Sequence, residues 1–299
     1  MNPMASDLQQ AHRPLAVFAY DFDGTLAPGN MQEHAFIPGE LNMSHADFWA
    51  EAAVFARRQR GDNVHAFMHL MLEKARGAGA DLSEDRWRER GKTLTLFPGV
   101  QAWFERQNAR AEALGLDLRH FIVSSGNREM IEGCPVAGFF ERVYASAFTF
   151  GEDGQASGVA LGVNYTNKTQ YLFRINKWTL DEWDDTAINA AVPKDARAVP
   201  FDRMVFFGDG LTDVPMMRLL TDEGGYAVAV YDSAKPSSVA AAGKLRNDGR
   251  ARFAGPADYT EGAPLDEQAH AMLQEMAARL KSSAAAVWPE RWEQPELRF

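Results

Sequence analysis

Short apolar runs recur along the chain and are separated by longer stretches with helical periodicity. The runs lie near residues 15–20, 120–124, 142–146, 204–207 and 226–230. Continuous apolar runs of this kind are typical of strands that are buried on both faces of a parallel sheet, and the stretches between them are typical of crossover helices. The pattern predicts an α/β fold with three layers, in which helices cover both faces of a Rossmann-like parallel sheet.

Residues 31–96 have a different pattern, because helical periodicity continues there without any strand signal. Apolar side chains mark one face of a first helix around Phe48–Ala56 and one face of a second around Val64–Leu72, and Ser83 is suited to cap a third. We therefore expect an all-helical cap over residues 31–96, inserted into an α/β core that comprises residues 1–30 and 97–299 with a C-terminal tail.

Two further segments have local signals of their own. Glycines and acids separate β-like runs between Ala147 and Val163, which predicts a small hairpin. The tail after Lys281 contains Trp288, Pro289, Trp292 and Pro295 and is too rich in proline for a regular helix. Its two tryptophans suggest that the tail docks either on the core or on a second subunit.

The composition is that of a soluble enzyme. The chain has 299 residues and a formal net charge of −10, which argues against nucleic acid or an anionic membrane as a partner. No apolar run approaches the ~20 residues of a membrane span, and residues 1–14 lack the layout of a signal peptide. The single cysteine, Cys134, cannot form an internal disulfide, which suits a reducing cytoplasm.

Two carboxylates stand two residues apart directly after the first apolar run, at Asp21 and Asp23, and Gly24 follows them. Side chains at i and i+2 lie on the same face of an extended chain, so both carboxylates can approach one small site. Asp21 can then act as a nucleophile and Asp23 as an acid or base, with a hard cation between them. An Asp-Gly pair that merely forms a turn is the alternative.

A second segment pairs hydroxyl groups with an expected helix start. Ser124 ends an apolar run, Ser125 follows it, and Gly126 is expected to open a helix. Hydroxyl groups beside the free N–H groups of a helix start are suited to bind phosphate oxygens. An ordinary helix cap is the alternative.

A third segment places Lys168 at an expected helix start, where a cation is unfavourable unless it faces an anion. A solvated lysine is the alternative reading, and Lys177 is a competing candidate for the same role. In a fourth segment, Asp209 and Asp213 flank a glycine-containing turn after the apolar run at residues 204–207. Carboxylates of this kind are suited to bind Mg²⁺, although surface acids in a plain turn would look the same.

These four segments together resemble the haloacid dehalogenase (HAD) superfamily of phosphohydrolases. The resemblance rests on Asp21-x-Asp23-Gly24-Thr25, the strand-terminal Ser124, Lys168 and Gly208-Asp209-Gly210-x-x-Asp213, in that order. It covers roughly Leu15 to Val230 and is strongest for the phosphoserine-phosphatase-like branch, whose helical cap follows the first motif. The gap between Lys168 and Asp209 is long for the family.

The resemblance implies a Mg²⁺-dependent hydrolase of a small phosphomonoester that works through an aspartyl-phosphate. Asp21 is then the nucleophile and Asp23 the acid and base. Ser124, Ser125 and Lys168 hold the phosphoryl oxygens. The metal is held by Asp21, the backbone carbonyl of Asp23 and Asp209, with Asp213 close by. A phosphotransferase or mutase is an enzymatic alternative, and a phosphate-binding regulatory protein on the same scaffold is a non-enzymatic one. The protein is expected to be cytoplasmic and could form a homo-oligomer.

Overall fold

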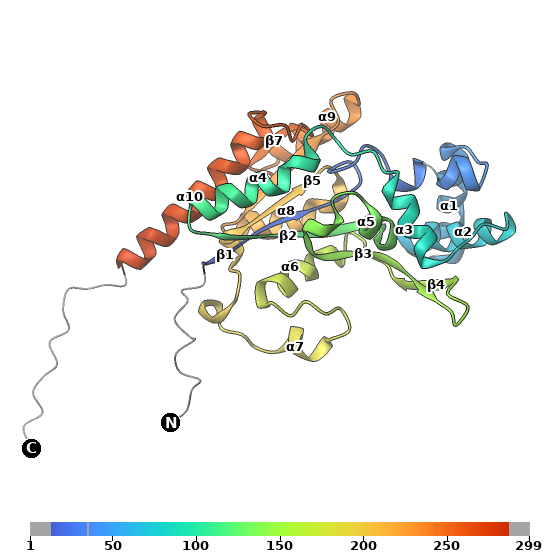
Figure 1. Ribbon diagram of the computed structural model, residues 1–299, viewed down its shortest axis with the longest axis horizontal. Coiled ribbons are helices and arrows are strands. Elements are labelled where there is room, and N and C mark those ends of the chain that lie inside the picture. The colour runs from blue at the N-terminus through green and yellow to red at the C-terminus, as the bar shows by residue number, and fades with distance from the viewer. Residues whose placement is uncertain (1–12, 35, 287–299) are drawn as a thin grey trace, which may run out of the picture.

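The computed structural model describes residues 13–34 and 36–286, and it contains one seven-stranded sheet (Figure 1). The strand order is β4-β3-β2-β1-β5-β6-β7. Every neighbouring pair is parallel except β3 and β4, which form an antiparallel hairpin. The central strand β1 therefore lies between β2 and β5, and the three acidic or serine-containing motifs lie at or directly after the carboxyl ends of these neighbouring strands.

The five predicted strands are all present. They are β1 (Leu15–Tyr20), β2 (Asp117–Asn127), β3 (Phe140–Phe150), β5 (Met204–Gly208) and β6 (Tyr226–Tyr231). Of these, β2 and β3 are several residues longer than expected. The predicted hairpin is confirmed, with β4 (Ala156–Leu161) as its second strand. The sequence analysis missed the edge strand β7 (Phe253–Pro256), whose four residues include a glycine and a proline and give little strand signal.

Alternate residues of β1 face opposite layers, as strand geometry requires. Phe18 and Tyr20 pack in one apolar cluster with α4 (Val100–Ala113) and α10 (Pro264–Ala286). Val17 and Ala19 pack in a second cluster with α6 (Lys168–Lys177), α8 (Val214–Asp222) and α9 (Pro236–Asn247). Figure 1 shows α4 and α10 running across the sheet. The predicted three-layer α/β fold is therefore confirmed.

The region expected to form the cap contains three helices, α1 (His45–Gln59), α2 (Asn63–Gly77) and α3 (Glu84–Lys92), which lie beyond one end of the sheet (Figure 1). Each begins at a side chain that accepts a hydrogen bond from the first turn, namely Ser44, Asp62 and Ser83. The predicted helix N-cap at Ser83 is thus present, and such a side chain typically stabilises a helix by ~1 kcal/mol.

The cap helices are packed against the core. The short helix α5 (Arg128–Gly133) meets α3 so closely that a Cβ on Gly91 would lie 2.0 Å from the carbonyl oxygen of Met130. Arg76 of α2 donates to the carbonyl oxygens of Ala156 and Ser157 in β4, at 2.8 and 3.0 Å. One apolar cluster includes buried side chains from both parts. The region expected to form the cap and the rest of the chain therefore share a continuous hydrophobic interior.

The chain enters and leaves the cap at adjoining points. The Phe97 amide donates a 2.9 Å hydrogen bond to the Leu26 carbonyl oxygen. Tyr259, which follows β7 and is fully buried, contacts the chain both where it enters and where it leaves this region. Its hydroxyl donates to the Thr25 carbonyl oxygen at 2.9 Å, and its amide donates to the Pro98 carbonyl oxygen at 2.8 Å.

Helix α10 extends past Lys281 to Ala286, so the expectation of irregular chain directly after Lys281 was wrong. The segment Lys281–Ala286 is rich in alanine and serine, which a helix accepts, and the first proline comes only at position 289. The proposed docking of Trp288 and Trp292 lies outside the described residues. A further short helix, α7 (Asp185–Asn189), lies in the long connection between Lys168 and Asp209. Within residues 13–34 and 36–286, no helix is long and apolar enough to cross a membrane.

Candidate active site

The site lies where the central strands end. Asp21 directly follows β1, Asp209 directly follows β5, and Ser124 lies near the end of β2. Because these three strands are neighbours and parallel, their carboxyl ends meet at one edge of the sheet. A cavity of about 510 Å³ opens there, and its lining includes Asp21, Asp23, Ser124, Ser125 and Asp209.

Lys168 links two carboxylates inside this site. Its side chain is fully buried, and its Nζ lies 2.7 Å from Asp21 Oδ2 and 2.7 Å from Asp213 Oδ1. Burial by itself would lower the pKa of Lys168, but the two carboxylates outweigh it and raise the pKa above the ordinary value. The ammonium group of Lys168 therefore stays charged beside the carboxylate of Asp21, the candidate nucleophile.

The competing lysine lies elsewhere. Lys177 ends helix α6, and its Nζ donates to the carbonyl oxygens of Ile188 and Ala190 at 2.6 and 2.8 Å. Ile188 lies in α7 and Ala190 directly follows it, within the long connection. Lys177 thus holds that connection in place, and Lys168 is the lysine that the structure brings to the carboxylates.

Asp21, Asp209 and Asp213 each offer an oxygen that lies within 4.8 Å of the others. Burial and the charges of neighbouring carboxylates raise the pKa of Asp209, and burial likewise raises the pKa of Asp213 although Lys168 opposes it. Three crowded carboxylates of this kind match the all-oxygen ligand set of a small divalent cation, whose charge would relieve their repulsion. The donor set therefore fits Mg²⁺.

Asp23 is set apart from this cluster. Its Oδ1 accepts a 2.9 Å hydrogen bond from the Met31 amide, and its carboxylate is not among the clustered oxygens. Burial, and after it the negative charge of Asp21, raise the pKa of Asp23 well above its usual range. A carboxyl group with a raised pKa is suited to general acid catalysis.

Two glycines let the motifs approach one another. Gly24 has φ +72°, and a Cβ at this position would lie 2.2 Å from Asp209 Oδ2. A Cβ on Gly126 would lie 2.2 Å from the Met31 methyl carbon and 3.1 Å from Asp23 Oδ2. Any larger residue at these positions would push the acidic side chains out of place.

The serine motif differs in detail from its prediction. The strand continues through Gly126, with a register shift between Ser124 and Asn127, and the helix begins only at Arg128 with Asn127 as its cap. The expectation that Gly126 opens the helix was therefore wrong, because the hydrogen-bonding side chain of Asn127 is the stronger start signal. Ser124 Oγ accepts from the Gly126 amide at 3.1 Å. Ser125 Oγ is buried and has no partner among the described residues.

The sequence analysis did not single out several residues that line the same cavity. Gln32 and Trp49 come from the region expected to form the cap, and Lys235 comes from the loop after β6. Gln32 and Lys235 carry no motif or spacing signal. Trp49 belongs to the apolar pattern of a helix, which is typical of a core position as well.

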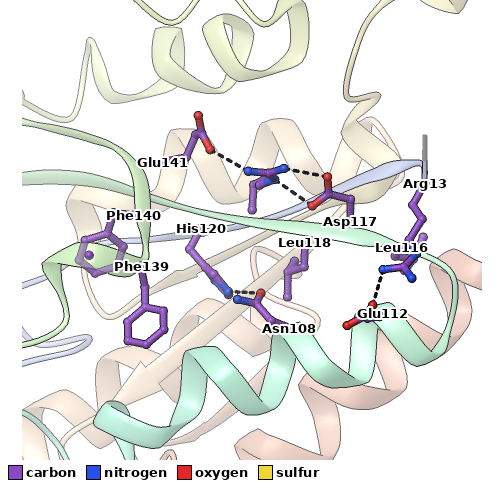
Figure 2. A pocket seen from close by; sticks show the side chains of 12 residues that line it. Arg13, Asn108, Glu112, Leu116, Asp117, Leu118, His120, Phe139, Phe140 and Glu141 are labelled. Carbon is purple, nitrogen blue, oxygen red and sulfur yellow. Dashed lines mark hydrogen bonds and ion pairs between the residues drawn. The ribbon is translucent and has the colours of Figure 1, made fainter. Parts of the chain in front are cut away.

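A second cavity, of about 420 Å³, lies at the opposite, amino-terminal edge of the sheet (Figure 2). Figure 2 shows Arg13 pointing at Glu112 and His120 at Asn108, and these pairs are 2.8 and 2.9 Å apart. Arg119 is paired with Asp117 and Glu141. Since these charged groups already have partners, this cavity offers none of the chemistry that the first one does.

Comparison with known proteins agrees with this geometry. The family model of haloacid dehalogenase-like hydrolases matches residues 18–218, which is more than half of the chain. The chain belongs to this family. The match includes every residue singled out above as a candidate nucleophile, acid, phosphate ligand or metal ligand. The resemblance to the HAD superfamily that the motifs indicated is therefore confirmed.

Individual relatives are distant. An uncharacterized protein from Borreliella burgdorferi is 28% identical over 273 residues, covering 82% of this chain and 92% of that protein. A HAD family hydrolase from Salmonella enterica serovar Typhi has a similar structure, with a TM-score of 0.51 and 16% identity, covering 81% of this chain and 67% of that one. A phosphoserine phosphatase solved as a phospho-aspartyl intermediate analogue aligns with a TM-score of 0.48 and 17% identity, covering 85% and 97%.

Proposed function

We propose that this hydrolase cleaves a small phosphomonoester with the help of Mg²⁺ and through an aspartyl-phosphate on Asp21. The observation that carries the proposal is the buried Lys168 between Asp21 and Asp213, next to the three-carboxylate cluster. A site with a nucleophile, a fixed cation and a cation-binding cluster can neutralise a phosphoryl dianion as it is attacked.

Asp21, Asp209 and Asp213, with the backbone carbonyl of Asp23, would hold the metal, and the bound ion would offset the repulsion between Asp21 and a phosphate dianion. Asp21 attacks phosphorus, and the bond from phosphorus to the ester oxygen breaks. Asp23 gives its proton to the departing oxygen, so the alcohol leaves neutral. The raised pKa of Asp23 supports this role, because the proton must be present at neutral pH.

The second half-reaction restores the enzyme. Asp23, now ionised, accepts a proton from water as that water attacks phosphorus, and the bond to Asp21 breaks to release inorganic phosphate. Lys168, Ser124 and Ser125 hold the phosphoryl oxygens throughout. The hydroxyl of Ser125 is buried in the cavity lining without a partner among the described residues, so it can donate to a phosphate oxygen.

Residues 31–96 would act as a cap that covers the reaction and chooses the substrate, because Gln32, Trp49 and Phe67 line the same cavity as the catalytic residues. A phosphotransferase or mutase would use the same first step and differ only in the acceptor. The half-buried Asp23, with its raised pKa, favours transfer to water. We further infer that the protein works in the cytoplasm, where its one cysteine, the buried Cys134, stays reduced.

The test is hydrolysis of 4-nitrophenyl phosphate with and without metal. Chelation with EDTA should abolish turnover, and added Mg²⁺ should restore it. Asp21→Asn should remove turnover and leave the far-ultraviolet circular dichroism spectrum unchanged, because the shape is kept and the nucleophile is lost. Full activity in excess chelator, or near-normal turnover in Asp21→Asn, would refute the proposal.

A further inference from the structure

The reaction cavity must also receive the alcohol part of a substrate, and its lining includes residues outside the carboxylate cluster. Its walls come from two directions. Gln32, Trp49 and Phe67 come from the region proposed as the cap, and Lys235 and Ser237 come from the loop after β6 and the start of α9. What these side chains can bind therefore indicates which phosphomonoester fits.

Gln32 is the unusual member of this wall. Gln32 is among the residues that line the cavity and is only 1% exposed, yet its buried Nε2 has no hydrogen-bond partner among the described residues. Buried amide groups in folded proteins nearly always have a partner, since leaving one unpaired is destabilising. An unpaired amide beside a reaction cavity is a donor for which the rest of the described chain supplies no acceptor.

The backbone around Gln32 is fixed on both sides. The amide of Met31 donates to Asp23 Oδ1 at 2.9 Å. On the other side, Glu33 Oε1 accepts from Asn30 Nδ2 at 2.7 Å and from Trp49 Nε1 at 2.6 Å. Gln32 is thus held between a residue anchored on the proposed acid and a residue anchored on the cavity wall. The chain segment that carries the Gln32 side chain is therefore held in place beside the cavity.

The charges nearby decide which kind of acceptor suits Gln32. The cavity lining includes four aspartates, Asp21, Asp23, Asp209 and Asp232, and one lysine, Lys235. Lys235 Nζ lies 3.9 Å from Asp232 Oδ2, and its side chain is more than half exposed. Lys235, the one lysine of this lining, is thus offset by Asp232, so the charged lining outside the proposed metal cluster carries no net positive charge to attract a second anionic group. An uncharged oxygen, such as a hydroxyl or carbonyl, would accept from the amide without needing such a charge.

The wall next to Gln32 is aromatic. The rings of Trp49 and Phe67 pack edge to face, with centroids 5.4 Å apart. The indole is oriented by its bond to Glu33. A flat or apolar carbon skeleton can pack against this pair.

We propose that Gln32 determines substrate specificity by donating to an uncharged oxygen on the alcohol part of the phosphomonoester, whose carbon skeleton packs against Trp49 and Phe67. This inference rests on the proposed function, because it places the phosphate at Asp21. It assigns to the substrate one phosphate, an apolar or planar body and a neutral acceptor.

The test compares phenyl phosphate with phenyl phosphates that carry a hydroxyl or acetyl group at each ring position, in the wild-type protein and in Gln32→Leu. Leucine has a similar size and no donor. For each substituted compound, kcat/KM is divided by kcat/KM for phenyl phosphate in the same protein. For at least one compound, this ratio should be ~10-fold higher in the wild type than in Gln32→Leu, which is the scale of one buried hydrogen bond. Taking the ratio between proteins cancels the intrinsic reactivity of each leaving group.

Two controls separate the possible outcomes. Ser125→Ala should slow all the compounds alike, because it acts at the shared phosphate. The melting temperature of Gln32→Leu should equal or exceed that of the wild type, since the variant removes an unpaired buried amide. A clear drop in melting temperature together with an unchanged substrate preference would show that Gln32 is only structural, and would overturn the proposal.

A binding measurement keeps the test independent of turnover. Calorimetry on Asp21→Asn, with and without Gln32→Leu, reads the same preference from the dissociation constants of the intact compounds. If binding shows the preference but the wild type hydrolyses nothing with Mg²⁺, the proposed function fails and the role of Gln32 stands. If hydrolysis proceeds with no preference that depends on Gln32, the role of Gln32 fails and the proposed function stands.

Discussion

Asn164 Nδ2 donates a 2.9 Å hydrogen bond to Asp62 Oδ2, and this bond joins the loop before Lys168 to the first turn of the cap helix α2. The other oxygen of Asp62 caps α2 by accepting from the amides of Val64 and His65. The Asn164 oxygen accepts from Thr166 and so shapes its own loop. One pair of side chains therefore connects the position of the cap to the position of the buried lysine.

This connection can be tested with variants that keep each local role. Asp62→Ser retains a helix-capping oxygen, and Asn164→Asp retains the oxygen that shapes the loop, but each removes the bond between them. We expect Asn164→Asp to lower the unfolding free energy by ~1–3 kcal/mol, because the donor is lost and two carboxylates then face each other. The double variant should lose less than the sum of the single losses in chemical denaturation. Strictly additive losses would show that the two side chains are not coupled.

The two lysines of α6 provide a matched comparison. Lys168→Ala should lower kcat by ~10²-fold or more, because it removes a cation that faces the attacked phosphoryl group. Lys177→Ala should leave kcat within a fewfold of the wild type, since its ammonium group binds the carbonyls of Ile188 and Ala190 instead. Steady-state kinetics on both variants decides the matter, and the reverse ranking would move the role to Lys177.

Gly24 should be irreplaceable for a reason that Gly115 does not share. Both have positive φ, +72° and +82°, so alanine strains the backbone at either position by ~1–2 kcal/mol. Only at Gly24 would the new methyl group meet Asp209, whereas nothing lies within 4 Å at Gly115. Gly115→Ala should lose stability and keep its kcat, and Gly24→Ala should also lose turnover and Mg²⁺ affinity. Normal Mg²⁺ affinity in Gly24→Ala would contradict the close approach.

His120 should make the protein sensitive to acid. It is buried between the Tyr20 hydroxyl, 3.0 Å from Nδ1, and Asn108 Oδ1, 2.9 Å from Nε2. Since Asn108 Oδ1 can only accept, the ring proton sits on Nε2, and Nδ1 accepts from the Tyr20 hydroxyl. Burial lowers the pKa of His120 from 6.5 to about 3 in the folded protein.

The unfolded chain therefore binds a proton on His120 as pH falls through 6.5, whereas the folded chain does so only near pH 3. Stability is unaffected above pH 6.5 and declines below it. At pH 5 the loss from this residue should be roughly 2 kcal/mol, at 1.36 kcal/mol per pH unit. His120→Gln, which can keep both hydrogen bonds, should show a correspondingly smaller fall in unfolding free energy between pH 7.5 and 5. Equal falls would mean that His120 is protonated in the folded state.

The sequence predicted the parts of this protein that depend on strong local patterns. The central strands were predicted from their apolar runs. Asp21 and Asp209 directly follow strands, Ser124 lies near the end of β2 and Lys168 begins α6, so the topology brings these motif residues together. The edge strand β7 is short and packs on one neighbour, which leaves almost no pattern to detect.

The rest depended on tertiary contacts that no periodicity reveals. Gln32 is significant only because nothing in the described chain accepts from its amide, and Lys235 only because the loop after β6 lies beside the cavity. The choice between Lys168 and Lys177 was open for the same reason. Both stand on one helix, and their different roles follow from which neighbours each one reaches.

The two adjoining points at which residues 31–96 join the rest of the chain are held in place, and this affects which inserts the protein could accept. Leu26 and Phe97 are hydrogen-bonded to each other, and Tyr259, from outside the inserted region, holds Thr25 and Pro98 in the same place. The distance that an insert must bridge is therefore set by the core and is independent of what the insert contains. A segment of another length or fold could replace residues 31–96 and start and finish at the same two points. The chemistry proposed at Asp21 could then be kept while the choice of substrate proposed for residues 31–96 is exchanged as a module.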